Sequence, residues 1–268
     1  MPLGKPLSFY NNPFGTWSQT TATFSFHEGL SLTDWLQFEP LITPVNIRIG
    51  RNTSVRLVEQ LHQVRYILEE KSTLFHFNAC DHDYTISFDN QGCLVHASGI
   101  ALTASCAVHS TVRLQAPQAS LVWQESVHVK SNQHYQTTLL VDHQAPSTHT
   151  HCQTQSVVDD YGRFDLRCDL SVQANAHQAS VKQRNLNLIT GPHGHISAYP
   201  QLHILNRSIT ASHGTATQPL PTDALWYMQS RGIPYSEAAQ LYLQGFLHSV
   251  FSTEFHELLT HYNLNDGV

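Results

Sequence analysis

The residue pattern with the clearest metal-binding chemistry is a histidine pair in the stretch THTHCQTQ, residues 148–155. Residues two apart on a β-strand share a face, so His149 and His151 would lie side by side while Cys152 points the other way. Two imidazoles can chelate a metal ion, but a site needs at least one further ligand, and the neighbouring sequence supplies none. Because the chain contains 19 histidines, the pattern favours a polar ladder facing solvent. His151 and Cys152 remain secondary metal-ligand candidates.

A paired-carboxylate site for acid–base chemistry could be built from Asp159 and Asp160. The pair stands in the tetrapeptide Asp-Asp-Tyr-Gly between two strand-like runs. Aspartate accepts local backbone hydrogen bonds, and Gly162 can adopt a positive φ, so the tetrapeptide predicts a turn. The sequence contains no GxSxG, HExxH or P-loop motif, so hydrolase or nucleotide chemistry has no local motif.

His213 differs from the other histidines in its position along the chain. It lies between Ser212 and Gly214, within residues 208–232, where strand-like sequence gives way to helix-forming sequence. A lone histidine at such a junction is most often a structural hydrogen-bonding residue. The residue pattern alone therefore assigns it no chemistry.

The elements that must position these residues are mainly β-strands. Short runs rich in β-branched and aromatic residues follow one another for roughly 160 residues without a helical pattern, which excludes a βαβ fold. In residues 164–172, apolar and polar residues alternate, which predicts a strand with one buried face. A sandwich, a propeller and a β-helix remain. No fixed repeat length supports a propeller, and polar Asn and Gln ladders favour a parallel β-helix.

Three regions are expected along the chain: an irregular N-terminal extension (1–54), a parallel β-helix core (55–217) and a small C-terminal helical domain (218–268). Prolines interrupt the first region, and its residues 32–38 form at most a short helical turn. In the last region, residues 224–231 predict a short helix, with Gly232 as its C-terminal stop. A second helix carries an apolar stripe of Leu243, Leu247, Phe251, Phe255, Leu258 and Tyr262. Either the β-helix or a partner must cover this stripe, and the sequence does not choose between them.

Composition narrows the function classes. Charged residues make up 13% of the chain and the net charge is −6, without a Lys/Arg cluster, so neither nucleic acid nor an anionic membrane is an expected partner. No run approaches the ~20 apolar residues of a transmembrane helix, and the first residues do not resemble a signal peptide. Five cysteines without a CxxC pair argue against a disulfide framework or a zinc ribbon. A reducing cytoplasm is the expected location.

Six stretches of the C-terminal half resemble, in order, the SufB/SufD family of iron–sulfur cluster assembly proteins, and they are most similar to its SufD branch. The stretches are residues 148–154, 157–172, 174–189, 199–204, 212–217 and 225–246. Each stretch alone is weakly diagnostic, whereas six in order are specific.

The resemblance implies a mainly β chain with a right-handed parallel β-helix and a small C-terminal helical domain. It implies a non-catalytic scaffold subunit in a cytoplasmic complex with a SufB-type protein and the ABC-type ATPase SufC, which alone would hydrolyse ATP. His213, in the Ser-His-Gly motif, would lie at the interface with the SufB-type protein as a candidate ligand for iron or a nascent cluster. No cofactor is expected to bind stably, and iron or a cluster would be held there only transiently. The residues expected to contact the ATPase are Trp226, Tyr227, Arg231, Gly232 and Phe246.

The sequence also departs from the family pattern. Ala211 stands where the family usually has a cysteine, and His203 replaces a usual acidic residue. Some 54 residues precede the expected core, fewer than the family's large N-terminal helical domain would need. These departures leave His213 as the one ligand that the resemblance transfers.

Two other hypotheses remain beside the SufD-like scaffold. The first is an enzyme, either a β-helix acting on polysaccharide or a metal hydrolase that uses His149, His151 and a distant ligand. The second is a homodimer with a structural role only. Co-purification with the two expected partners would distinguish the scaffold hypothesis from the enzyme and homodimer hypotheses.

Overall fold

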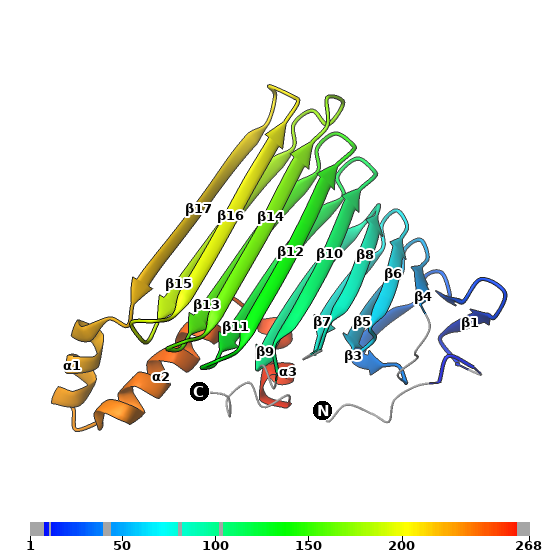
Figure 1. The fold of residues 1–268 in the computed structure, drawn as a ribbon. Coiled ribbons are helices and arrows are strands. Elements are labelled where there is room, and N and C mark those ends of the chain that lie inside the picture. The colour runs from blue at the N-terminus through cyan, green and yellow to red at the C-terminus, as the bar shows by residue number, and fades with distance from the viewer. Residues whose placement is uncertain (1–7, 11, 40–43, 80–81, 102–103, 262–268) are drawn as a thin grey trace.

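The protein was analysed as a computed structural model, which describes residues 8–10, 12–39, 44–79, 82–101 and 104–261. Most of these residues form strands in two sheets (Figure 1). The nine-stranded sheet contains, in spatial order, β1 (Gly15–Ser18), β2 (Thr23–Phe26), β4 (Val45–Ile49), β6 (Gln63–Leu68), β8 (Tyr84–Asn90), β10 (Cys106–Leu114), β12 (His134–His143), β14 (Arg163–Val172) and β16 (His195–Ile204). The eight-stranded sheet contains β17 (Thr210–Pro219), β15 (Ser180–Ile189), β13 (His149–Val158), β11 (Ser120–Val129), β9 (Cys93–Ala101), β7 (Thr73–Asn78), β5 (Ser54–Glu59) and β3 (Ser31–Gln37).

From β2 onward consecutive strands alternate between the two sheets, so each coil of the chain contributes one strand to each. Apart from the antiparallel pair β1–β2, all neighbouring strands run parallel. This arrangement is a flattened parallel β-helix, which confirms the mainly β fold predicted from the sequence.

The coils lengthen along the chain. Val45 lies beside Val64, 19 residues later, whereas Tyr135 lies beside Phe164, 29 residues later. The strands lengthen in step, from 5 residues in β4 to 10 residues in β14 (Figure 1). Because the repeat length changes from coil to coil, the sequence shows no fixed period although the fold is repetitive.

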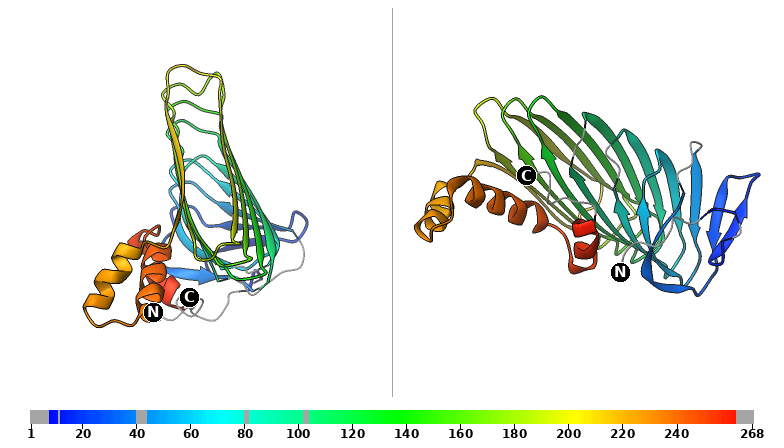
Figure 2. Two further views of the ribbon diagram at one scale, coloured as in Figure 1. Left: turned by 60° about the vertical axis from the view of Figure 1, so that its left-hand side comes forward. Right: turned by 90° about the horizontal axis from the view of Figure 1, so that it is seen from below.

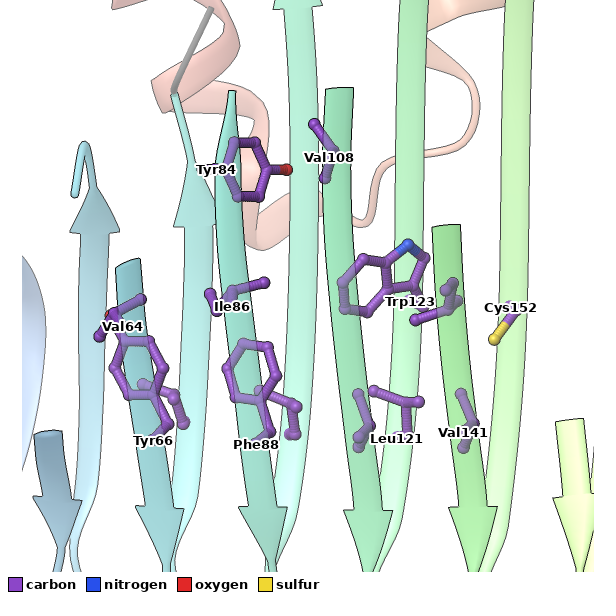
Figure 3. Packing of buried hydrophobic residues seen from close by; sticks show 14 of the residues in the cluster. Val64, Tyr66, Tyr84, Ile86, Phe88, Val108, Leu121, Trp123, Val141 and Cys152 are labelled. Carbon is purple, nitrogen blue, oxygen red and sulfur yellow. The ribbon is translucent and has the colours of Figure 1, made fainter. Parts of the chain in front are cut away.

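Inward-facing side chains fill the space between the sheets and stack in rows from coil to coil (Figure 3). Tyr66 stacks on Phe88 with ring centroids 5.1 Å apart. At the N-terminal end the interior is closed by an aromatic cluster of Phe9, Trp17, Phe24, Phe26 and Phe38. This cluster covers the first coil as the cap of a solenoid does.

The expected irregular extension over residues 1–54 is wrong for its described part. Residues 15–49 contain strands β1 to β4, and residues 31–37 form β3 rather than a helical turn. The register of β3 against β5 shifts between Ser31 and Trp35, so a bulge breaks the two-residue alternation that identifies a strand in sequence. Pro13 and Pro44 fall just outside strands, where they remove no ladder hydrogen bond. Residues 1–7, 11 and 40–43 lie outside the described residues.

The Asp-Asp-Tyr-Gly tetrapeptide forms the predicted turn between β13 and β14. The residue with positive φ is Tyr161, at 61°, and not Gly162. Gly162 is required for a different reason, because a Cβ there would lie 2.9 Å from the carbonyl oxygen of Val129 in the coil below. The stacking of turns on one another therefore selects the glycine.

The C-terminal segment contains α1 (Thr222–Ser230), α2 (Tyr235–His248), a 3-10 turn η1 (Thr253–Phe255) and α3 (His256–His261). Gly232, with φ 88°, ends α1 as predicted. The sequence predicted one second helix along the apolar stripe. In the structure α2 ends at His248, and the rest of the stripe lies in the 3-10 turn η1 and in α3. Within the described residues no helix has the length and apolarity needed to cross a membrane.

The described part of the apolar stripe packs on the chain's own β-helix, and Tyr262 lies outside the described residues. Leu243 and Leu247 of α2 cover Val157 and Leu188 on the outer face of the eight-stranded sheet. The segment after α2 continues across the same face toward the N-terminal coils (Figure 2). Of the two alternatives left open by the sequence, cover by the β body is therefore the one observed.

Candidate functional site

The C-terminal end of the β-helix is open. Strand β17 pairs with β15 on one side, and no described strand pairs with its other side. All ten residues of β17 are exposed, in contrast to the aromatic cluster that closes the opposite end. Unpaired edge strands of this length are templates for pairing with another chain.

The hydrogen-bonding groups on this edge can be assigned by alternation along the strand. The N–H of Thr210 donates to the carbonyl oxygen of Ala179 in the neighbouring coil. Because successive residues direct their backbone groups to opposite sides, the N–H and C=O groups of His213 and Thr215 point to the open edge. Every second residue of this exposed ten-residue strand thus directs its backbone groups to the open edge, which makes the edge a ready docking site for a further strand.

His213 stands at the mouth of the coil interior. It lies beside Gln183, which is buried, and Gln183 lies beside Cys152, which is also buried. His213 therefore occupies the register position that continues an inward-facing row of the eight-stranded sheet. Two residues further along β17, Thr215 holds the same position relative to the buried Asn185. The mouth is polar on this sheet.

The imidazole of His213 is exposed and can act as a metal ligand. Ala211, two residues away on the same strand, has no ligand atom. In the part of the chain that the structure describes, no three His, Cys, Asp or Glu side chains converge on a point that could hold a metal ion. Among the described residues, His213 therefore has no second side chain with which to share a metal ion.

The histidine pair His149 and His151 lies on the outer face of β13, as the alternation predicts, whereas Cys152 faces the interior. His151 lies beside Lys182 on β15. Partial burial lowers the pKa of His151, and the nearby Lys182 ammonium lowers it further. The same ammonium repels a metal cation. His151 and Cys152 lie on opposite faces and cannot share an ion. Among the described residues no third His, Cys, Asp or Glu converges on His149 and His151, so the geometry gives the metal-hydrolase hypothesis no support.

Helix α1 presents the aromatic residues expected at a partner interface. The side chains of Trp226 and Tyr227 are 68% and 62% exposed, and Leu225 is the buried residue that attaches α1 to the rest of the chain. The guanidinium of Arg231 lies 5.4 Å from the ring centroid of Tyr227. Phe246 differs from these residues, because it packs partly buried against the cluster that fixes α2 to the sheet.

The sequence did not reveal a set of buried titratable groups inside the coils. His76 and His96 face each other with their Nδ1 atoms 2.8 Å apart. Glu59, fully buried, accepts a hydrogen bond from the hydroxyl of Tyr66, and burial raises the pKa of Glu59 to about 7. One feature of the sequence could have indicated the position of His76. It lies two residues after the inward-facing Leu74 on the same strand, so its side chain points to the same face.

Comparisons with known proteins agree with this geometry. Residues 43–246 match the family described as "SUF system FeS cluster assembly, SufBD core domain". An iron–sulfur cluster assembly SufBD family protein of Synechocystis is 26% identical over 110 residues, which cover 41% of this chain and 24% of that protein. A SufBD family protein of Mycobacterium tuberculosis is 24% identical over 139 residues, or 48% of this chain and 16% of that protein.

The iron–sulfur cluster assembly protein SufD of Escherichia coli is 27% identical over 92 residues, or 34% of this chain and 22% of that protein. The matched segments thus span less than a third of the length of each of these relatives.

Proposed function

This chain belongs to the SufBD core family of the SUF iron–sulfur cluster assembly system, and we propose that it acts there as a SufD-like, non-catalytic scaffold subunit. In this proposal it pairs with a SufB-type protein through the open end of its β-helix and docks a SufC-type ATPase through α1. The observation that carries the proposal is the exposed edge strand β17 at the end opposite the aromatic cap.

The two ends of the β-helix support the pairing step. A solenoid needs a cap at each end to remain soluble and monomeric, and in the described part of the chain no strand pairs with the outer side of β17. A partner that adds a strand to β17 would satisfy the backbone groups of the edge and cover the polar mouth at His213. A second copy of this chain could pair in the same way, and the association experiment below distinguishes the two.

The docking step rests on the exposure of α1. Tryptophan, tyrosine and arginine contribute most of the binding energy in many protein interfaces, and Trp226, Tyr227 and Arg231 occur together here. Helix α1 is attached to the body mainly through α2 and lies beside it at the edge of the molecule (Figure 2). The side chains of Trp226 and Tyr227 are exposed on it. This combination suits a surface that a partner covers.

The cargo of the assembly system is iron and sulfide, and His213 is the residue of this chain that we propose contacts it. A neutral imidazole is a suitable ligand for iron, especially beside a thiolate. Since Ala211 supplies no thiol, the thiolate would come from the SufB-type partner. Cluster binding would then depend on the pair of chains and not on this chain alone.

The direct test is co-expression of this chain with SufB-type and SufC-type proteins and affinity purification through a tag on this chain. We expect the three proteins to elute together in one size-exclusion peak. Elution of this chain alone, or as a dimer of itself while both partners are folded, would remove the heteromeric scaffold role.

Edge pairing predicts the effect of one proline. Thr215→Pro removes an N–H that points to the open edge and leaves the ladder to β15 intact, since proline is tolerated on edge strands in that orientation. We expect at least roughly tenfold weaker association with the SufB-type partner, because a central strand hydrogen bond is lost and the ring obstructs the added strand. Thr215→Val, which keeps the N–H, is the matched control. Equal affinity of the two variants would contradict edge pairing.

The ATPase interface predicts that Trp226→Ala and Tyr227→Ala together weaken SufC binding by roughly 30-fold or more, as measured by calorimetry. The free energy of unfolding should change by less than about 0.5 kcal/mol, because both side chains are exposed. Tyr161→Asn is the matched control: it removes an equally exposed aromatic residue from a turn, and asparagine tolerates the positive φ at that position. A similar loss of affinity in this control would contradict docking on α1.

A further inference from the structure

A continuous row of polar side chains runs through the interior of the β-helix on its eight-stranded sheet. Each residue of the row lies beside the next in register, from one coil to the following one. Six members are 7% exposed or less: Glu59, Asn78, Ser98, Glu125, Thr154 and Asn185. The seventh, Thr215 on β17, is exposed at the open mouth. The row therefore leads from a buried carboxyl group to solvent.

The facing sheet shows how unusual such a row is in a packed interior. The five inward residues of β14 all belong to the hydrophobic core, and they are Phe164, Leu166, Cys168, Leu170 and Val172. A polar group buried in such an interior destabilises the fold unless hydrogen bonds compensate it. Six consecutive coils nevertheless place a polar residue at the same register position. The row therefore needs hydrogen-bond partners that side chains like those of β14 do not supply.

Two atoms of the row lack such partners. In the described part of the chain the Oγ of Ser98 and the Nδ2 of Asn185 are buried without a hydrogen bond. The amide of Asn185 is held in one orientation, because its Oδ1 accepts a hydrogen bond from Asn187 at 2.6 Å. Buried polar atoms without a protein partner are usually bound by ordered water. Ser98 and Asn185 lie on opposite sides of Glu125 along the row, so both halves of the row need water.

Glu125 places a titratable group in the middle of the row. Its carboxyl group accepts hydrogen bonds from the hydroxyl of Tyr135 at 2.9 Å and from Nε1 of Trp123 at 3.3 Å. Burial raises the pKa of Glu125 above its ordinary value, which favours the protonated form. At the inner end of the row, burial raises the pKa of Glu59 to about 7. The row thus connects two carboxyl groups that hold protons inside the fold.

We propose that the row holds a file of ordered water, which carries protons between the mouth and the carboxyl groups of Glu125 and Glu59. Each transfer moves one proton along a hydrogen bond from one oxygen atom to the next. A proton that enters at the mouth replaces one that leaves there, so the exchange changes neither the charge nor any oxidation state. The serine and threonine hydroxyls continue the file, and the two amides hold the water in place. The aromatic cluster closes the opposite end, so protons enter at the mouth.

The test measures how fast the buried carboxyl protons exchange with solvent. The full-length chain is diluted from H₂O into D₂O at about pH 6.5, and infrared spectroscopy follows the shift of the carboxyl C=O bands. Glu125→Gln and Glu59→Gln identify the band of each group. Amide exchange of β13 is measured in the same sample. We expect the carboxyl protons to exchange at least 100-fold faster than the β13 amides, because water reaches them without unfolding.

An apolar plug in the row should slow this exchange. Thr154→Val keeps the shape of the side chain and removes its hydroxyl, and it should lower the exchange rate of the Glu125 proton at least tenfold. Asn185→Leu, one coil nearer the mouth, should have the same effect, and amide exchange of β13 should stay unchanged in both variants. Thr138→Val, on the outer face of β12, is the matched control and should keep the wild-type rate.

Two results would overturn the water file. The first is carboxyl exchange in the wild-type chain as slow as that of the β13 amides, since protons would then reach the interior only by unfolding. The second is a wild-type rate in a folded plug variant. The wild-type comparison decides the question even where both plug variants fail to fold. The inference does not rest on the scaffold role, because the chain is tested without partners.

Discussion

Replacing Phe255 with alanine is expected to lower the free energy of unfolding by about 3 to 5 kcal/mol, the range observed when a buried phenylalanine is truncated in a packed core. The Phe255 side chain is fully buried. Its ring lies 5.5 Å from that of Trp35 and 6.1 Å from that of Phe77, measured between centroids. Both neighbours belong to the rigid sheet, so the cavity left by alanine cannot collapse.

The effect is large because Phe255 is the anchor of a strap. The C-terminal segment runs from the open end of the β-helix back to its early coils (Figure 2). Between the two ends, Ser249 hydrogen-bonds Gln155 at 3.2 Å and the N–H of Ser252 donates to Gln124 at 3.1 Å. These polar contacts alone contribute little, since a hydrogen bond adds a net ~1 kcal/mol.

Denaturant unfolding measures the loss, and limited proteolysis after residue 248 reports release of the strap. Phe255→Leu, which keeps most of the apolar volume, should lose less than half as much stability. Leu241→Ala, at an exposed position of α2, should lose less than about 0.5 kcal/mol. A loss below 1 kcal/mol for Phe255→Ala would show that the strap is held elsewhere.

Local patterns in the sequence were sufficient for elements whose periodicity is regular. The alternation in residues 164–172 identified β14 and its buried face, and Gly232 identified the end of α1. The inward face of β13 was also assigned correctly, because side chains alternate strictly on a strand. In each case the pattern is set within about ten residues.

Other features depend on contacts between coils and left no local pattern. His76 and His96 lie 20 residues apart in sequence and meet only because parallel coils stack. Gly162 is selected by the carbonyl group of the coil below. The open edge of β17 is invisible in sequence, because whether a strand gains a second neighbour depends on the coils around it and not on its own residues.

Acidification is expected to destabilise the protein steeply below pH 6.5, chiefly through His76 and His96. Burial lowers the pKa of His76 to about 3 and, with a further contribution from His76, lowers that of His96 well below 6.5. The interior around the pair is aromatic: His96 stacks on Trp123 with ring centroids 3.7 Å apart, and Tyr66 meets His76 edge-on at 4.9 Å. In the described part of the chain neither Nε2 atom has a hydrogen-bond partner, so a proton added at Nε2 would have no acceptor.

The sign follows from proton counting. Between pH 6.5 and about 3 the unfolded chain protonates both histidines and the folded chain does not, so unfolding is favoured as the pH falls. One such histidine titrated down to pH 4 lowers the free energy of unfolding by roughly 3 kcal/mol. His143, whose pKa burial lowers to about 4, acts in the same direction.

Glu59 acts in the opposite direction over part of this range. Its pKa is raised to about 7, so between pH 4.5 and 7 the folded chain holds a proton that the unfolded chain has lost. The stability that Glu59 contributes is complete below pH 4.5 and is lost as the pH rises to 7. In the wild-type protein it offsets part of the histidine effect, and Glu59→Gln should therefore make the acid-induced loss steeper.

The slope of the unfolding free energy against pH distinguishes the contribution of His76 and His96 from that of the other titrating groups. Urea unfolding at intervals between pH 7 and pH 4 gives that slope for each variant. His76→Phe/His96→Phe removes both buried imidazoles from the aromatic interior and should leave only the shallower dependence due to His143 and the carboxylates. His109→Phe, on the outer face of β10, is the matched control and should keep the wild-type slope. A double variant with that wild-type slope would show that the buried pair does not govern acid stability, because a histidine contributes to the slope only where folding changes its pKa.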